Sequence, residues 1–146
     1  MPEVASAESL TQFLRSLRAV RQYQQRSVPT PVVDDILEVA RWSGSASNKQ
    51  PAEIVVVTDR GTLGKLAGLG GYVFHVGGAA LAMIIVMPGE WEEGETFDEG
   101  RIAERIMLAA LAHGVGSSIG WLDGAGRAEA KRLLGVPDKR LLRTIL

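Results

Sequence analysis

The chain has 146 residues, the length of one domain, and a chain of this size buries roughly 70% of its unfolded surface. Hydrophobic residues make up 46% and charged residues 23%, with a formal net charge of -1. This composition predicts a globular protein and gives no support to a nucleic-acid or membrane-surface partner. The absence of cysteine excludes disulfides, thiolate catalysis and cysteine-ligated metals.

Targeting signals are not evident in the sequence. Residues 1–9 contain no basic region followed by an apolar run, so we expect no signal peptide. The longest apolar stretch, residues 79–87, is far shorter than the roughly 20 residues that span a bilayer. We therefore expect a cytoplasmic protein with a single domain over residues 1–146, without internal repeats or linkers.

The first third of the chain predicts two helices and a loop. Ser6 is a candidate N-cap, and the apolar residues after it recur at i, i+3, i+4 and i+7 (Leu10, Phe13, Leu14 and Leu17). Residues 18–26 are polar and basic and leave this helix. Thr30 and Pro31 suit an N-cap and the first position of a second helix, whose apolar spacing continues to Ala40. Residues 43–51 are a loop by composition.

The middle of the chain predicts two buried strands around a helix. Residues 54–58 are a β-branched run typical of a buried strand. Asp59 is a candidate cap for a helix through Leu69, which glycines then interrupt. Residues 79–87 form the second apolar run, and residues 88–96 are expected to be an acidic, solvated loop.

The last third predicts the longest helix, which begins at Asp98 and ends before Gly114, a residue suited to the C′ position. A short strand over residues 117–122 and a helix over residues 127–134, ended by Gly135, follow. Residues 143–146 read as the opening of another strand. The order of elements predicts an α+β (mixed α/β) layer architecture.

Hydrolytic and metal chemistry have little support in the sequence. There is no Walker loop, no GxGxxG and no HExxH. His75 and His113 are not placed at a metal-ligand spacing, and we interpret His113 as a surface or capping residue near a helix end. We assign no metal ligands and no catalytic acid or base.

Two segments have residue types suited to binding. Arg18 and Arg21 follow a helix, and two planar guanidinium groups three residues apart can clamp a phosphate; the alternative is a solvated basic patch. Residues 43–51 carry hydroxyls, an amide pair and N–H groups outside regular pairing. They suit the edge of a planar, polar heterocycle; the alternative is an ordinary turn.

Together these segments resemble the nitroreductase superfamily. The stretch R-A-V-R-Q-Y (residues 18–23) precedes Val28-Pro29 and a helix, and G-S-A-S-N-K-Q-P (residues 44–51) leads into I-V-V-V-T (residues 54–58). The helix over residues 100–112, the segment H-G-V-G-S-S-I-G (residues 113–120) and L-L-G-V-P (residues 133–137) also resemble the family. The resemblance covers nearly the whole chain, and its specificity lies in the order and spacing of the set.

The resemblance implies a central sheet flanked by helices and a homodimer with FMN at its interface. It implies hydride transfer from NADH or NADPH through the flavin N5 to an electron-poor acceptor, a nitroaromatic or a quinone, by a ping-pong mechanism. The basic stretch would bind the phosphate and ribityl chain, the loop would lie along the flavin, and the strand after G-x-G-S would approach its ring. The implied cofactor-binding residues are Arg18, Ala19, Arg21, Gly44, Ser45, Asn48, Gln50, Ile119, Gly120 and Trp121.

The chain departs from the family pattern at several positions. Leu17 replaces the first signature Arg and Ala19 the signature Ser, which removes possible phosphate ligands. Gly44 stands in place of Pro, and Ala52 in place of Trp. Family members usually continue for several tens of residues beyond the position of Leu146, so we expect either a truncated chain or weaker flavin binding.

Three alternatives stay open. A flavin-dependent dehydrogenase or oxidase of a specific metabolite would have the same flavin site. A flavin-less interaction protein on the same scaffold is favoured by Leu17, Ala19 and the short C-terminus. A generic α/β domain is the third. The residues identify neither the acceptor nor the choice between NADH and NADPH.

Overall fold

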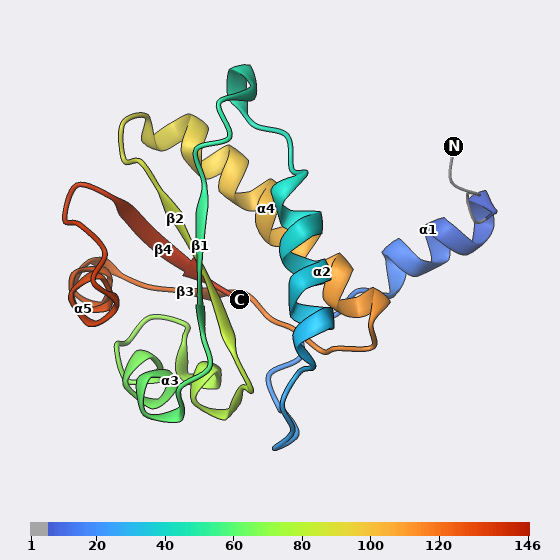
Figure 1. The fold of residues 1–146 in the computed structure, drawn as a ribbon, viewed down its shortest axis with the longest axis horizontal. Helices are drawn as coiled ribbons and strands as arrows, with labels where there is room; N and C mark the ends of the chain where they lie inside the picture. Colours follow the sequence, from blue (N-terminus) through green and yellow to red (C-terminus); the bar gives the residue numbers. More distant parts are fainter. Residues whose placement is uncertain (1–5) are drawn as a thin grey trace.

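The computed structural model describes residues 6–146, so the first five residues of the segment searched for a signal peptide lie outside it. Its centre is an antiparallel sheet with the strand order β1-β2-β4-β3 (Figure 1). The strands are β1 (Glu53–Val57), β2 (Ala82–Met87), β3 (Gly120–Trp121) and β4 (Leu141–Ile145). Helices cover both faces of the sheet, which confirms the predicted α+β fold.

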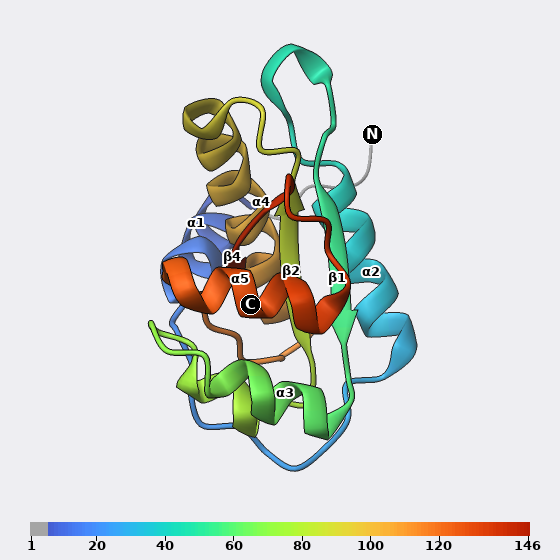
Figure 2. The same cartoon turned by 90° about the vertical axis from the view of Figure 1, so that its left-hand side faces the viewer.

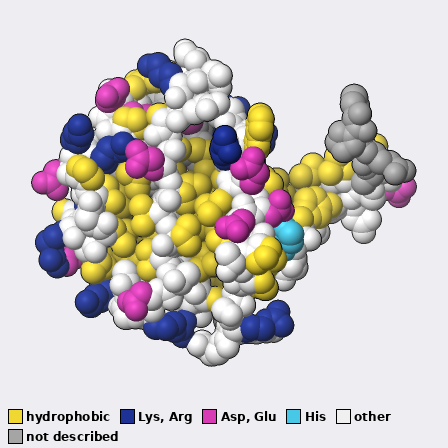
Figure 3. Space-filling view, in the orientation of Figure 1, with side chains coloured by type: hydrophobic (Ala, Val, Ile, Leu, Met, Phe, Trp, Pro, Cys, Tyr) yellow, Lys and Arg dark blue, Asp and Glu magenta, His cyan; other side chains and the backbone are white. Residues whose placement is uncertain are grey.

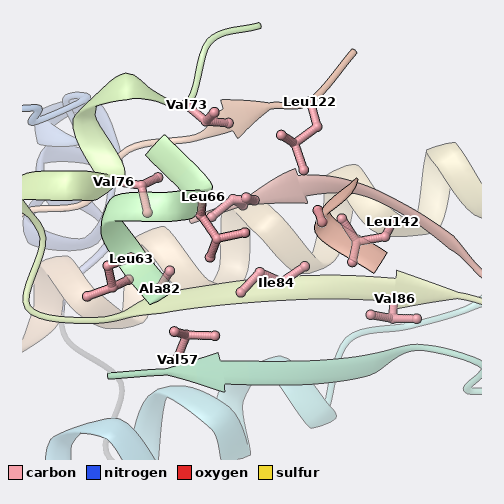
Figure 4. Close-up of a cluster of buried hydrophobic side chains, with 12 residues drawn as sticks. Val57, Leu63, Leu66, Val73, Val76, Ala82, Ile84, Val86, Leu122 and Leu142 are labelled. Carbon is pink, nitrogen blue, oxygen red and sulfur yellow. The ribbon is translucent and has the colours of Figure 1, made fainter. Parts of the chain in front are cut away.

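The helices form two layers, each with its own apolar core. Helices α2 (Thr30–Arg41) and α4 (Glu92–Ala112) lie on one face of the sheet, and α3 (Arg60–Ala67) and α5 (Gly124–Leu134) lie on the other (Figures 1 and 2). Strand β2 is buried on both faces because its side chains alternate: Ile84 joins the α3–α5 core (Figure 4), and Ile85 joins the α2–α4 core.

Helix α1 (Ala7–Ser16) projects from the body (Figure 1). The prediction that Ser6 caps it is confirmed, since the Ser6 hydroxyl accepts the Ser9 N–H at 3.2 Å. None of its residues is buried, and Leu10 and Leu14 are 42% and 47% exposed. Figure 3 shows hydrophobic side chains along this arm. The apolar face predicted from the sequence therefore has no matching surface among residues 6–146.

Two strand predictions need correction. Residues 54–58 were expected to form a buried strand, but β1 lies at the sheet edge, pairs only with β2, and buries only Val57. The strand expected over residues 79–87 begins at Ala82, because the 3₁₀ turn η2 (Phe74–Gly78) precedes it.

The acidic segment over residues 88–96 is not a solvated loop, because α4 begins at Glu92 rather than at Asp98. The buried carboxylate of Glu95 accepts N–H bonds from Gly89, Glu90 and Trp91 at 2.8–3.1 Å. These bonds anchor the turn that leads into the helix.

Helix ends were predicted correctly where the capping residue lies within a few residues of the backbone groups that it caps. Asp59 caps α3 through the Thr62 N–H at 2.7 Å, and Gly114 and Gly135 follow α4 and α5 with φ of +68° each, a left-handed conformation that glycine tolerates. Several other boundaries differ from the predictions. Pro29, not Thr30, is the N-cap of α2.

Helix α3 ends at Ala67 rather than Leu69, and α5 begins at Gly124 rather than residue 127. Strand β3 covers only two residues of the six expected over 117–122, and β4 begins at Leu141 rather than residue 143. Within residues 6–146 there is no helix long and apolar enough to cross a membrane.

Candidate functional site

The basic stretch after α1 lies against the segment that leads into β3. Ala19 forms a parallel bridge with Ser117, and the Val20 N–H donates to the Ser117 carbonyl at 2.8 Å. This pairing brings Arg18, Ala19 and Arg21 together with Ile119, Gly120 and Trp121, although about a hundred residues separate them in the chain. Six of the ten predicted site residues therefore belong to one surface, which we call the platform.

The two arginines of the platform differ in how they are held. One guanidinium nitrogen of Arg18, Nη1, donates at 2.7 Å to the carbonyls of Arg15 and Leu17 at the end of α1. Arg21 is exposed and makes no side-chain hydrogen bond or ion pair with residues 6–146. Its charge is therefore available to an anion.

His75 is a platform residue that the sequence did not reveal. Its side chain is buried, and neither ring nitrogen has a hydrogen-bond partner among residues 6–146. Burial lowers the pKa of the imidazole, and the nearby Arg21 charge lowers it further. His75 is thus neutral at pH 7, with one N–H donor and one acceptor unsatisfied, and an unsatisfied buried polar atom is costly.

Exposed aromatic residues belong to the segments that carry His75 and Gly120. Tyr72 is 75% exposed, Phe74 71% and Trp121 39%. The Tyr72 N–H donates to the Trp121 carbonyl at 2.9 Å, so these two residues are neighbours. Gly120 permits the close approach of β3, because a Cβ there would lie 3.3 Å from Cε1 of His75. Clustered exposed apolar side chains commonly mark a binding surface.

Trp121 is further held by two cations. The Cζ atoms of Arg127 and Arg143 lie 5.3 Å and 5.6 Å from the centroid of its ring. Such contacts are cation–π interactions, each worth roughly 0.5–2 kcal/mol. They stabilise the orientation of an aromatic ring that a planar ligand would meet.

The remaining predicted residues belong to the loop over residues 44–50, which contains the 3₁₀ turn η1 (Ala46–Asn48). Ser47, Asn48 and Gln50 have φ of +50° to +52°, a left-handed conformation that costs a non-glycine residue about 1–3 kcal/mol. The Ser45 hydroxyl accepts the Gln50 N–H at 2.8 Å, and the Gln50 amide donates to Asn48 at 3.1 Å. Strain of this kind is concentrated at functional sites.

The platform and this loop do not meet within one chain. In Figure 1 the loop lies at the top of the molecule, beyond β1, whereas the segment that follows the basic stretch runs along the bottom. A cavity of about 610 Å³ adjoins the platform and includes Tyr23, His75 and Ser117 in its walls. The loop borders a different cavity of about 280 Å³. The ten predicted residues thus form two half-sites.

His113, which was not assigned to the site, has a structural role. His113 is the C-cap of α4, as expected, and its Nε2 lies 2.7 Å from Oδ2 of Asp35. Among residues 6–146 there is no group of three or more side chains arranged to hold a metal ion.

Comparisons with known proteins show what this chain is similar to. The model of the Nitroreductase family matches residues 14–69. A protein of Methanothermobacter thermautotrophicus named as an NADH dehydrogenase/NAD(P)H nitroreductase is 29% identical over 142 residues, which cover 91% of this chain and 72% of the relative.

Solved structures extend the similarity to three dimensions. An FMN-dependent nitroreductase from Clostridium difficile superposes with a TM-score of 0.80 at 26% identity, over 91% of this chain and 82% of that one. A nitroreductase from Desulfovibrio desulfuricans in complex with FMN gives 0.77 at 26% identity, over 97% and 85%. A Bacteroides thetaiotaomicron structure gives 0.84 at 23% identity, over 96% and 85%, which supports the fold alone.

Proposed function

We propose that this chain is a member of the nitroreductase superfamily and an FMN-dependent enzyme that uses NAD(P)H to reduce an electron-poor acceptor. The acceptor class that we propose is a nitroaromatic or a quinone. The observation that carries the proposal is the platform, where free cationic, aromatic and unsatisfied polar groups lie together.

The platform has the residue types that FMN needs. Arg21 and the remaining guanidinium donors of Arg18 suit a phosphate, which guanidinium groups bind with charge-assisted hydrogen bonds. Tyr72 and Phe74 offer exposed rings to a planar heterocycle, and the unsatisfied imidazole nitrogens of His75 suit its polar edge. Bound FMN would supply hydride acceptance and donation in a ping-pong cycle.

The loop over residues 44–50 provides the second set of contacts. Its amides, Asn48 and Gln50, suit the edge of the ring. Among residues 6–146, no hydrogen bond is formed by the N–H groups of Gly44 or Ser45. These donors are therefore available to a flavin ring nitrogen, and such a bond influences reduction potential.

A homodimer accounts for the separation of the two half-sites. A second copy can place its loop over the platform of the first, and symmetry then completes two equivalent sites. The exposed apolar side chains of α1 offer further surface to such a partner. We also propose that residues 1–146 form a single domain and that the protein is cytoplasmic.

The visible absorption spectrum of the purified protein, before and after anaerobic addition of NADPH, tests this function. We expect a flavin spectrum that bleaches. Protein that stays colourless after incubation with FMN would contradict the proposal and favour the flavin-less alternative. A flavin that NADPH and NADH both leave oxidised would exclude NAD(P)H as the donor.

The double variant Arg18→Ala, Arg21→Ala tests the phosphate site. We expect it to lose FMN, because two charge-assisted contacts worth roughly 1.5–3 kcal/mol each are removed. A matched control is Arg41→Ala, Arg132→Ala, which removes two exposed arginines that lie outside the platform. Unchanged FMN occupancy in the first variant would refute the assignment.

A flavin-dependent dehydrogenase of a specific metabolite would have the same flavin site, so only its substrate preference distinguishes it from a nitroreductase. Reduced enzyme is offered nitroaromatics, quinones and oxidised metabolites in turn, and the preferred acceptor is the one with the highest kcat/KM.

A further inference from the structure

The loop over residues 44–50 is in contact with the second and third turns of α4. The Arg101 guanidinium occupies the space beside Gly44: a Cβ on Gly44 would overlap its Nη2 and lie 3.1 Å from its Cζ. In its observed rotamer, Arg101 occupies the space that a side chain on residue 44 would fill. The sequence has glycine here where the family signature has proline.

Asp98, one turn earlier on α4, binds the same loop. Its side chain is buried, and its Oδ2 accepts the Ala46 N–H at 2.9 Å. Its Oδ1 lies 3.4 Å from Nη1 of Arg101, so the carboxylate also orients the guanidinium. A buried carboxylate thus links the loop backbone to a cation that is itself in contact with the loop.

The loop needs such support from outside. Ser47, Asn48 and Gln50 have left-handed backbone conformations. The other side-chain hydrogen bonds of the loop are internal to residues 45–50. Local bonds alone leave the loop free to move as a unit relative to the sheet. Among residues 6–146, Asp98 is the side chain outside the loop that forms a hydrogen bond with residues 44–50, and Arg101 lies beside Gly44.

We propose that Asp98 and Arg101 are positioning residues, which fix the loop in the conformation that meets the flavin, and that Gly44 is the residue that admits Arg101. The inference rests on the proposed function only for what the loop binds. That Asp98 and Arg101 hold the loop is a property of the flavin-free protein as well.

A double-mutant cycle between Gly44 and Arg101 tests the proposal. Gly44→Ala displaces the flexible guanidinium without deleting its charge, and Arg101→Ala deletes it. We expect each substitution to weaken FMN binding to the flavin-free protein by about tenfold, and the double variant to be no weaker than either, because both remove the same contact. Additive losses, near a hundredfold in the double variant, would overturn it.

Hydrogen–deuterium exchange in the flavin-free protein gives a second readout. Amides of residues 44–50 should exchange about tenfold faster in both single variants and in Asp98→Asn, because a loop with weaker contacts to α4 opens more often. The melting temperatures of the Gly44→Ala and Arg101→Ala variants are expected to stay close to that of the parent, because the Arg101 guanidinium is half-exposed. Unchanged exchange would overturn the proposal.

Arg105→Ala is the matched control, because Arg105 lies one turn further along α4 and donates to the Trp42 carbonyl ahead of the loop. It should change neither exchange nor FMN affinity, and Arg101→Lys should restore part of both. An equal effect of Arg105→Ala would overturn the proposal in favour of a general charge effect. If the parent protein binds no FMN, the proposed function fails, and the exchange data alone decide whether Arg101 and Asp98 hold the loop.

Discussion

At the scale of single residues, His75 has opposite effects on folding and on ligand binding. Its two buried, unsatisfied ring nitrogens destabilise the flavin-free protein but give a ligand two polar atoms to bind. We expect His75→Leu to raise the free energy of unfolding by about 1 kcal/mol and to weaken FMN binding by about tenfold. Urea unfolding and fluorescence titration measure the two quantities. A variant that is less stable than the parent, or that binds FMN as tightly as the parent, would contradict this role.

The same residue predicts a pH dependence of stability. Burial, assisted by the Arg21 charge, lowers the pKa of His75 in the folded state. Below the ordinary histidine value of about 6.5 the unfolded chain binds the proton more readily, so stability falls as the solution is acidified. The difference in unfolding free energy between the parent and His75→Leu should therefore widen from pH 7.5 to pH 5.5. A difference independent of pH would show that His75 is not held neutral.

At the scale of elements, the start of α4 depends on Glu95. Burial raises the pKa of this carboxyl, but the N–H bonds from Gly89, Trp91 and Glu90 outweigh it and leave the pKa below its ordinary value. Glu95→Gln weakens three charge-assisted bonds, and we expect a loss of about 1–3 kcal/mol at pH 7. The control Glu93→Gln alters an exposed carboxylate on the same turn.

The stabilisation by Glu95 has a definite pH range. A carboxyl with a lowered pKa contributes fully above the ordinary glutamate value of about 4.3, and the contribution is lost as pH falls through the folded-state pKa. The gap in unfolding free energy between parent and Glu95→Gln should therefore narrow in strong acid. A gap that stays constant would mean that the charge of Glu95 is unimportant and that its shape alone matters.

These elements also show which parts of the fold the sequence could predict. Ser6, Asp59, Gly114 and Gly135 were assigned correctly because each acts on backbone groups within a few residues. The start of α4 was missed because its acidic residues were read as solvated. One of those residues, Glu92, is exposed as expected, but it pairs with the buried Arg143, which lies 51 residues further along the chain.

The candidate site follows the same division. The two binding segments were visible because each is a contiguous run of suited residue types. His75, Asp98 and Arg101 were not, because nothing in their spacing relates them to those segments; only the packing of η2 and α4 does so. Nor does the sequence say that one chain leaves the two segments at opposite ends.

At the scale of the whole molecule, the proposed dimer predicts that flavin binding is a property of a pair of chains, because each chain has two separated half-sites. One variant, Arg18→Ala with Arg21→Ala, removes the platform cations. A second, Asn48→Ala with Gln50→Ala, removes the polar side chains of the loop. Each variant alone should bind little FMN. When the two are unfolded together and refolded, random pairing makes about half of the dimers mixed, and each mixed dimer has one intact site.

The expected recovery is therefore about a quarter of the parent FMN content, because one of two sites is intact in about half of the dimers. The control refolds each variant alone and should recover none. Native mass spectrometry establishes that mixed dimers form, so that the FMN content can be interpreted. Mixed dimers without FMN would place both half-sites in the same chain and contradict the shared site. Recovery near a quarter requires the loop of one chain to complete the platform of the other, because no single chain in the mixture has both.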